Sequence, residues 1–182
     1  QIVSQVPGTR HHIRPADMPL PFASPSSANP SRSIPLAPGS MPVVQSEYKI
    51  NLFSDRPRHA RWMTVAPSGE VFVAESGVGR VSLLADEDGD GVAERFSVFA
   101  EHHSWPHGLE VVGEHLYVAD TRRVWRYAWR PGQLRAEEPP KAVTKRGALG
   151  SGFGHSTRTL LFGAESTHFY VAIGSMRNIA RE

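Results

Sequence analysis

Two histidines of this 182-residue chain have the surroundings that acid–base chemistry needs. His155 follows the glycine-rich stretch 147–154 and precedes an apolar segment, so the sequence predicts that it lies where a strand begins. An imidazole there can take a proton near neutral pH, or it can cap the strand by bonding to the backbone. His107 precedes another apolar segment and can contact a substrate or be a structural turn histidine. Residue type alone favours the structural interpretation for both.

An acidic turn offers ligands for a metal ion. Carboxylates alternate and a glycine follows them, as at the start of calcium-binding loops, at Asp86, Asp88, Asp90 and Gly91. An EF-hand is not expected, because its twelfth position needs a glutamate and here is Ser97, and because strands flank the loop. A calcium ion in a hairpin loop, with Glu94 as a further ligand, and a solvated turn without a metal are both consistent with this pattern.

A repeat indicates which elements position these groups. Short apolar segments with an aromatic residue recur around Phe72, Tyr117 and Tyr170, at spacings of 45 and 53 residues. Proline and glycine turns separate further apolar segments between them. The predicted strands are 48–53, 62–65, 71–74, 80–84, 108–112, 114–120, 124–129, 159–162 and 169–173. A period of about 45 residues with about four strands in each unit is typical of β-propeller blades, so the predicted class is all-β.

The number of repeats indicates an incomplete propeller. Residues 46–182 hold roughly three four-stranded blades, whereas propellers close with about four to eight. An open arc of three leaves a blade face and a sheet edge bare. We therefore expect the chain to be the N-terminal part of a longer propeller, or to gain its missing blades from elsewhere.

Residues 1–45 are expected to form an extended leader without a core of its own. They contain nine of the 15 prolines and a single acidic residue, Asp17. Proline removes a backbone donor and interrupts regular ladders. The predicted organisation is a proline-rich leader, 1–45, followed by a partial propeller domain, 46–182.

Composition and motifs exclude several classes of function. The chain has a net charge of +2 and no cysteine, which rules out disulfide and thiolate chemistry. No apolar run approaches the roughly 18 residues of a membrane span, and there is no P-loop, dinucleotide fingerprint or nucleophile elbow. Arginines and aromatic residues interleave in 122–130, as in nucleic-acid-binding proteins, but their alternation favours an outer strand with solvent-facing arginines.

The order of these motifs resembles the soluble glucose/sorbosone dehydrogenase family, six-bladed propellers that oxidise sugars with pyrroloquinoline quinone (PQQ). The likeness covers about residues 46–182, and the leader is also similar to leaders of bacterial members. Blade cores are common to many propellers, whereas the block His-x-x-Arg-Thr-Leu at 155–160 is more specific. The segments that carry the likeness are 61–76, 79–81, 86–91, 105–109, 154–160 and 173–175.

The resemblance implies PQQ-dependent oxidation of a sugar or aldose, with PQQ on the axis, a calcium ion beside it, an external electron acceptor and a periplasmic or secreted location. In the glucose-oxidising relatives, the histidine that matches His155 takes the proton from the sugar hydroxyl. The candidate substrate contacts are then His107, Arg158, Arg177 and Asn178. The family's cationic cofactor ligands and catalytic calcium ligands lie in later blades, so residues 1–182 alone are expected to bind PQQ poorly or not at all.

The sequence departs from the glucose enzymes at one position. They carry an aspartate after the glycine that matches Gly174, whereas this chain has Ser175, which cannot stabilise an imidazolium by charge. Either Arg158 and water orient His155 in place of the aspartate, or His155 is a weaker base. This departure from the glucose enzymes favours a sorbosone-like relative. The alternative is a non-catalytic propeller that binds a glycan or a protein. A calcium-dependent lactonase ranks last, because the blade starts lack acidic metal ligands.

Overall fold

The computed structural model describes residues 37–150 and 155–174 and, in the N-terminal segment, residues 10, 12, 14–18, 20, 32 and 34–35. The chain divides into two units, Gln1–Ser40 and Met41–Glu182. The described part of the first unit contains a 3₁₀-helix, Pro15–Asp17 (η1). The described part of the second is all-β, without an α-helix. Within the described residues, no helix has the length and apolarity to cross a bilayer.

The first sheet is a four-stranded antiparallel meander. Its strands follow one another in space as they do in the sequence: β1 (Ala60–Val65), β2 (Val71–Glu75), β3 (Arg80–Ala85) and β4 (Arg95–Ala100). The β1–β2 turn closes with a hydrogen bond from the Gly69 N–H to the Ala66 carbonyl at 2.9 Å. Gly69 has a φ of 100°, which explains the glycine in this turn. A short 3₁₀ segment, Ser76–Val78 (η2), connects β2 to β3.

The second sheet repeats this pattern, and the described part of the third contains two antiparallel strands of the four expected in a blade. The second has four antiparallel strands in chain order: β5 (Gly108–Val112), β6 (His115–Ala119), β7 (Val124–Ala128) and β8 (Lys141–Ala142). The third pairs β9 (Arg158–Phe162) with β10 (Phe169–Ile173). Phe72, Tyr117 and Tyr170 lie in the second strand of three separate sheets. The predicted repeat therefore corresponds to equivalent structural units.

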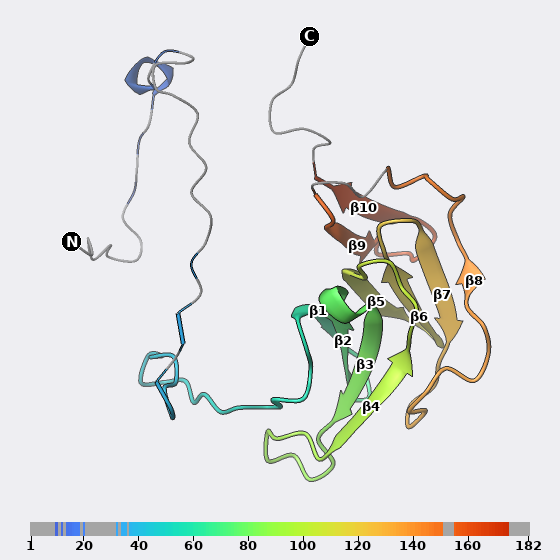
Figure 1. The fold of residues 1–182 in the computed structure, drawn as a ribbon, viewed down its shortest axis with the longest axis horizontal. Coiled ribbons are helices and arrows are strands. Elements are labelled where there is room, and N and C mark those ends of the chain that lie inside the picture. The colour runs from blue at the N-terminus through green and yellow to red at the C-terminus, as the bar shows by residue number, and fades with distance from the viewer. Residues whose placement is uncertain are drawn as a thin grey trace. The chain divides into compact units, whose positions relative to one another are not determined.

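The sheets meet along their first strands and fan outward from them (Figure 1). β5 contacts both β1 and β9. Gly108 marks the closest approach, since a Cβ atom there would lie 2.3 Å from the Arg158 carbonyl oxygen and 2.7 Å from the Leu160 nitrogen. A residue without a side chain is needed for β5 and β9 to come this close.

Apolar side chains fill the two joints between the sheets. At the first joint, Phe72 makes edge-on contacts with Phe99 and Trp129 at centroid distances of 5.1 and 5.2 Å. Side chains on the two faces of β6 pack in different joints: Leu116 lies in the first joint and Ala119 in the second. Burial of both faces of the central sheet agrees with the apolar strands of the sequence.

The two faces that point away from these joints expose large apolar residues. Met63 and Val65 of the first sheet are each 62% exposed, and Leu161 and Tyr170 of the third are 60% and 67% exposed. Exposed apolar surface of this kind is typical of interaction surfaces.

The predicted strands differ from the structure in three places. Residues 48–53 were predicted to open a strand, but they form none. Phe53 instead packs on the face of the first sheet, against Val73 and Leu84, where a segment cannot extend the hydrogen-bonded ladder. β4 and β8 were not assigned from the sequence. β4 follows the acidic turn, and β8 has only two residues.

Candidate active site

The loops before β1 and β5 meet the turns after β2 and β6. The His103 N–H donates to the Gly79 carbonyl at 2.9 Å, the Thr121 N–H donates to the Ser104 carbonyl at 2.9 Å, and the Ser76 hydroxyl donates to the Pro106 carbonyl. The first residue of β9 pairs with the last of β10, so the third sheet has an equivalent end. We call these ends together the loop end; its described segments are 54–59, 76–79, 101–107, 120–123, 143–150, 155–157 and 174.

His155 lies at the loop end, just before the inner strand β9, as the sequence predicted. It is exposed and packs over Gly174. A Cβ atom at Gly174 would lie 2.7 Å from the His155 Cβ and 3.5 Å from its Nδ1. The side chain of His155 therefore packs closely against Gly174, where a larger residue would not fit. The role of this histidine as a base stays a prediction.

Arg158, the first residue of β9, is only 2% exposed. Its Nε donates to the Leu149 carbonyl at 3.0 Å, and its Nη1 donates to the carbonyls of His155 at 2.8 Å and Thr157 at 2.7 Å. Burial lowers the pKa of its guanidinium. These contacts support a role in holding the loop before β9. Direct contact with a substrate stays a prediction.

His107 precedes β5 and is 8% exposed. Burial lowers its pKa, and the nearby charges of Arg61 and Arg158 lower it further. Its ring bonds to the Arg158 carbonyl, and its Nδ1 is buried without a partner among the described residues. The Trp62 ring lies 5.3 Å away, centroid to centroid. A buried acceptor without a partner costs about 1–3 kcal/mol.

The structure thus brings together three of the five histidine, arginine and asparagine residues predicted for the site. His107 contacts the Arg158 carbonyl, and the Arg158 side chain contacts the His155 carbonyl. Arg177 and Asn178 lie outside the described residues, as does Ser175.

The sequence analysis missed His59 and Trp105. His59 precedes β1 as His155 precedes β9, and its Nδ1 accepts a hydrogen bond from the Gly77 N–H at 3.1 Å. Its ring meets Trp105 edge-on at 6.0 Å. The backbone of both residues is in the left-handed region, with φ of 55° and 53°. Non-glycine residues are strained in this conformation, and such strain is often found at functional sites. Aligning the repeats would have found His59, because each imidazole stands over a glycine that follows a second strand.

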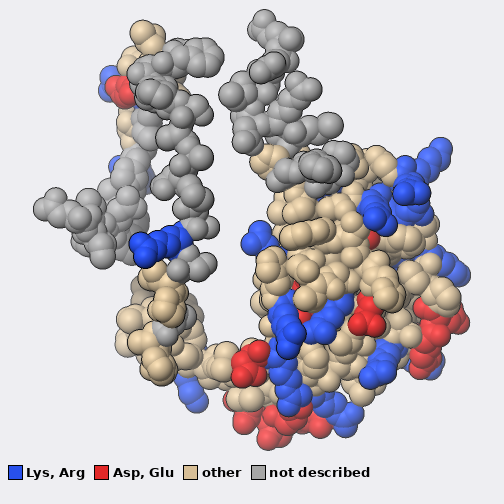
Figure 2. All heavy atoms as spheres, viewed as in Figure 1, with Lys and Arg blue, Asp and Glu red and all other residues tan. Residues whose placement is uncertain are grey.

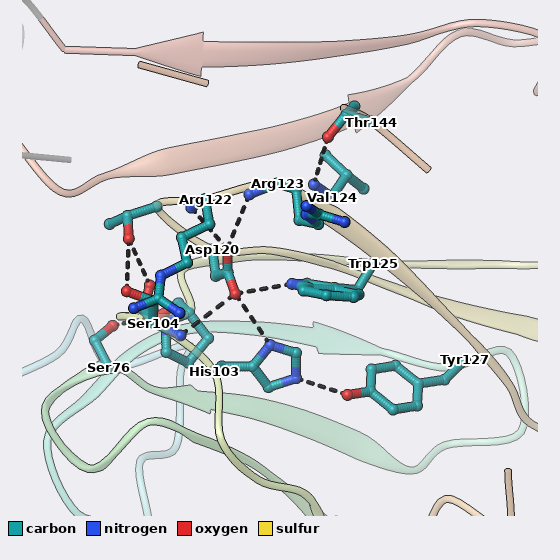
Figure 3. A network of polar contacts seen from close by, with 12 residues as sticks. Ser76, His103, Ser104, Asp120, Arg122, Arg123, Val124, Trp125, Tyr127 and Thr144 are labelled. Atoms are coloured by element: carbon teal, nitrogen blue, oxygen red, sulfur yellow. Dashed lines mark hydrogen bonds and ion pairs between the residues drawn. The ribbon is translucent and has the colours of Figure 1, made fainter. Parts of the chain in front are cut away.

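A buried polar network ties the loop before β5 to the second sheet (Figure 3). Tyr127 Oη lies 2.9 Å from His103 Nε2, and His103 Nδ1 lies 3.4 Å from Asp120 Oδ2. The Trp125 indole donates to the same carboxylate at 2.8 Å. Burial raises the pKa of Tyr127 to about 12, so the phenol keeps its proton and donates to His103.

Asp120 is the centre of this network. Burial alone would raise its pKa, but hydrogen bonds from His103, Trp125 and two backbone N–H groups outweigh burial and place the pKa below its ordinary value of 3.8. Both nitrogens of His103 have partners. The network therefore stabilises the joint and does not resemble a poised base.

A second buried carboxylate anchors the loop before β1. Glu75 is fully buried and pairs with Arg80 through two hydrogen bonds of 2.8 and 3.0 Å. It also accepts hydrogen bonds from the Ser82 hydroxyl and the Arg58 N–H. The last bond holds the residue before His59 against the sheet.

The acidic turn joins β3 to β4, at the opposite end of β3 from the loop end. Figure 2 shows acidic side chains gathered over this turn. Four carboxylates place one oxygen each within 4.8 Å of one another: Asp86, Asp88, Asp90 and Glu94. β3 has six residues, so about 17 Å of strand separates this cluster from the loop end. A metal ion here is too far away to contact a substrate beside His155.

Two solved structures have a fold similar to that of this chain. The holo PQQ domain of a pyranose dehydrogenase from Coprinopsis cinerea is similar with a TM-score of 0.60 at 20% identity, over 70% of this chain and 30% of that chain. A Trichoderma reesei protein of carbohydrate-active enzyme family AA12 is similar with a TM-score of 0.57 at 22% identity, over 68% of this chain and 32% of that chain. This chain thus spans about a third of the length of these structures. No curated protein sequence matches it.

The family follows from the sequence. The TrAA12-like family model matches residues 42–182, and the chain belongs to this family. This membership confirms the resemblance to PQQ-dependent sugar dehydrogenases that the motifs indicated.

The described residues fit PQQ in part. PQQ carries three carboxylates, so its site needs cations and hydrogen-bond donors. Arg61 is exposed and lies close enough to His107 to lower its pKa, whereas the Arg158 guanidinium is buried and bonds to backbone carbonyls.

Proposed function

We propose that this chain forms the first three blades of a β-propeller that oxidises a sugar or aldose with PQQ. Three equivalent sheets meet along their first strands and stack through apolar joints, as blades do. The exposed apolar faces of the first and third sheets are where further blades would pack. Family membership supports the cofactor, and the resemblance suggests six blades in all.

One observation carries the chemistry: an imidazole stands at the loop end of the inner strand of the third sheet. His155 then takes the hydroxyl proton of the sugar while the hydride on the same carbon departs, and the alcohol becomes a carbonyl. When bound, PQQ supplies the acceptor for this hydride. An external acceptor would take up the two electrons.

The neighbouring residues would orient the substrate. Burial lowers the pKa of His107 and favours its neutral form. Its Nδ1, which has no partner among the described residues, would accept a hydrogen bond from a sugar hydroxyl if a shift of the loop exposed it. Arg61 lies nearby and would attract an anionic group. Arg177 and Asn178 stay candidates for substrate contact.

We assign the acidic turn a structural calcium ion. Its four clustered carboxylates suit the oxygen ligands that calcium prefers, with carbonyls or water completing six to eight ligands. Its distance from the loop end supports a structural role, and the calcium ion of catalysis would be held by later blades.

Oxidation of sugars fits a location outside the cytoplasm, either periplasmic or secreted. Family membership supports this location, because a solved structure of similar fold is a carbohydrate-active enzyme.

The test compares His155→Gln with the unaltered full-length protein, loaded with PQQ and calcium, by dye reduction with a panel of sugars. Loss of a general base should lower kcat about 10²–10⁴-fold. The PQQ absorbance of the bound cofactor should be retained. His168→Gln is the matched control, because His168 is exposed and follows the β9–β10 turn away from the loop end.

Two results would contradict the proposal. Unchanged kcat in His155→Gln would remove the histidine from the chemistry. Failure of the full-length protein to bind PQQ would favour a non-catalytic propeller that binds a glycan or a protein.

A further inference from the structure

We propose that Arg158 is a positioning residue for the reaction assigned to His155. Its buried guanidinium holds the carbonyls of Leu149, His155 and Thr157 and so fixes the loop that carries the imidazole. This inference rests on the proposed function, in which His155 is the base.

The first argument is the unusual environment of the arginine. Arg158 is only 2% exposed, and no carboxylate of the described residues forms an ion pair with it. A buried charge is strongly unfavourable unless hydrogen bonds or an opposite charge compensate it. Three backbone carbonyls provide that compensation, so the local fold of the loop and the burial of the arginine depend on each other.

The second argument is the shape of the guanidinium. Its donors lie in one plane and point in fixed directions. Nε reaches Leu149 while Nη1 reaches His155, so one group joins backbone positions six residues apart. A lysine ammonium is a single charged point on a flexible stem and cannot hold both directions at once.

The third argument is that Arg158 is itself fixed. Its carbonyl accepts a hydrogen bond from the His107 ring and packs where Gly108 has no side chain. The position of His155 relative to β5 is therefore set through Arg158. A displacement of about 1 Å in a reacting group can lower the rate about 10²-fold, so a loosened loop should impair catalysis.

The experiment is a double-mutant cycle in the PQQ-loaded full-length protein. Arg158→Gln should lower kcat about 10–100-fold with little change in KM. The kcat of Arg158→Lys should fall between that of the unaltered protein and that of Arg158→Gln. In a His155→Ala background, Arg158→Gln should cause almost no further loss, because the two residues act as one unit.

Two controls separate positioning from stability. Arg146→Gln changes an exposed arginine in the same connection, and Leu83→Ala opens a cavity in the first joint. Below its melting temperature, Leu83→Ala should keep kcat although it lowers Tm. Independent losses from Arg158→Gln and His155→Ala would overturn the proposal.

A second readout does not depend on activity. Hydrogen exchange of peptides covering 143–157 should speed up at least tenfold in Arg158→Gln and stay unchanged in Arg146→Gln and Leu83→Ala. Unchanged exchange in Arg158→Gln would also overturn the proposal. If His155→Ala keeps full turnover, the proposed function fails, whereas the exchange experiment still decides whether Arg158 holds the loop.

Discussion

At the scale of residues, the histidines of this chain separate by what surrounds them. His103 has a partner on each ring nitrogen and belongs to a buried network. His107 is buried with one nitrogen unpaired among the described residues. His155 is exposed at the loop end. His103 is therefore a structural histidine, whereas His107 and His155 stay candidates for substrate contact and proton transfer.

The Asp120 network predicts a pH-dependent contribution to stability. The lowered pKa of Asp120 means that its contribution is present above the unfolded pKa, near 3.8, and is lost as pH falls through the folded value. Asp120→Asn should lower the free energy of unfolding by about 2–3 kcal/mol at pH 7. Urea unfolding at pH 7 and at pH 3 checks this, with exposed Asp55→Asn as the control. A difference that stays constant down to pH 3 would contradict it.

The acidic turn predicts calcium binding independent of catalysis. Calcium at about 100 times its Kd should stabilise the protein by about 2.7 kcal/mol, and Asp88→Asn combined with Asp90→Asn should abolish this gain. Thermal unfolding with and without a chelator measures it, and magnesium serves as the control ion. Equal calcium stabilisation in the double variant would show that the ion binds elsewhere.

At the scale of elements, the first strands decide where the candidate site lies. β5 lies between β1 and β9, and Gly108 allows the close approach on one side. The arginine-rich segment fits the same arrangement, because Tyr127 and Trp129 pack in the first joint while Arg122 and Arg130 are exposed. The aromatic residues therefore face the neighbouring sheet as the sequence predicted, but β7 lies between β6 and β8 and is not an outer strand, and Arg123 and Arg126 are only half-exposed.

Gly108→Ala adds a single methyl group but should strongly lower the free energy of unfolding. The added Cβ would clash with the Arg158 carbonyl oxygen at 2.3 Å, and β9 would have to shift. We expect a loss of about 3 kcal/mol and a fall in kcat. Gly113→Ala is the matched control: it has φ of 56° with open space around it, so only backbone strain opposes the change, and the loss should be about 1 kcal/mol. Equal losses in urea unfolding would show that packing at Gly108 is loose.

At the scale of the whole molecule, the described sheets leave apolar faces at both ends of the series. Met63 and Val65 lie on one and Leu161 and Tyr170 on the other. The solved structures of similar fold are about three times as long as the part this chain matches. In the proposed propeller, further blades would pack on both faces and cover these residues.

Tyr170→Glu tests this packing in the full-length protein. A covered face would bury the new carboxylate, and the free energy of unfolding should fall by about 3 kcal/mol or more. Tyr48→Glu is the control, because Tyr48 is similarly exposed, at 69%, and lies outside the strands. Losses within about 0.5 kcal/mol for both variants would show that solvent covers the face.

The sequence by itself determined the fold class, the repeat and the place of His155, because alternation of apolar residues and turn chemistry are local properties. It failed at residues 48–53, where apolar residues cover a sheet face instead of joining a ladder. Only the tertiary structure decided that Arg158 is buried against carbonyls, that a nitrogen of His107 has no partner among the described residues and that the acidic turn lies at the far end of β3. The burial of His107 depends on contacts between strands distant in the sequence, and the contacts of Arg158 depend on how the loop before β9 folds. A pattern of alternating apolar residues encodes neither.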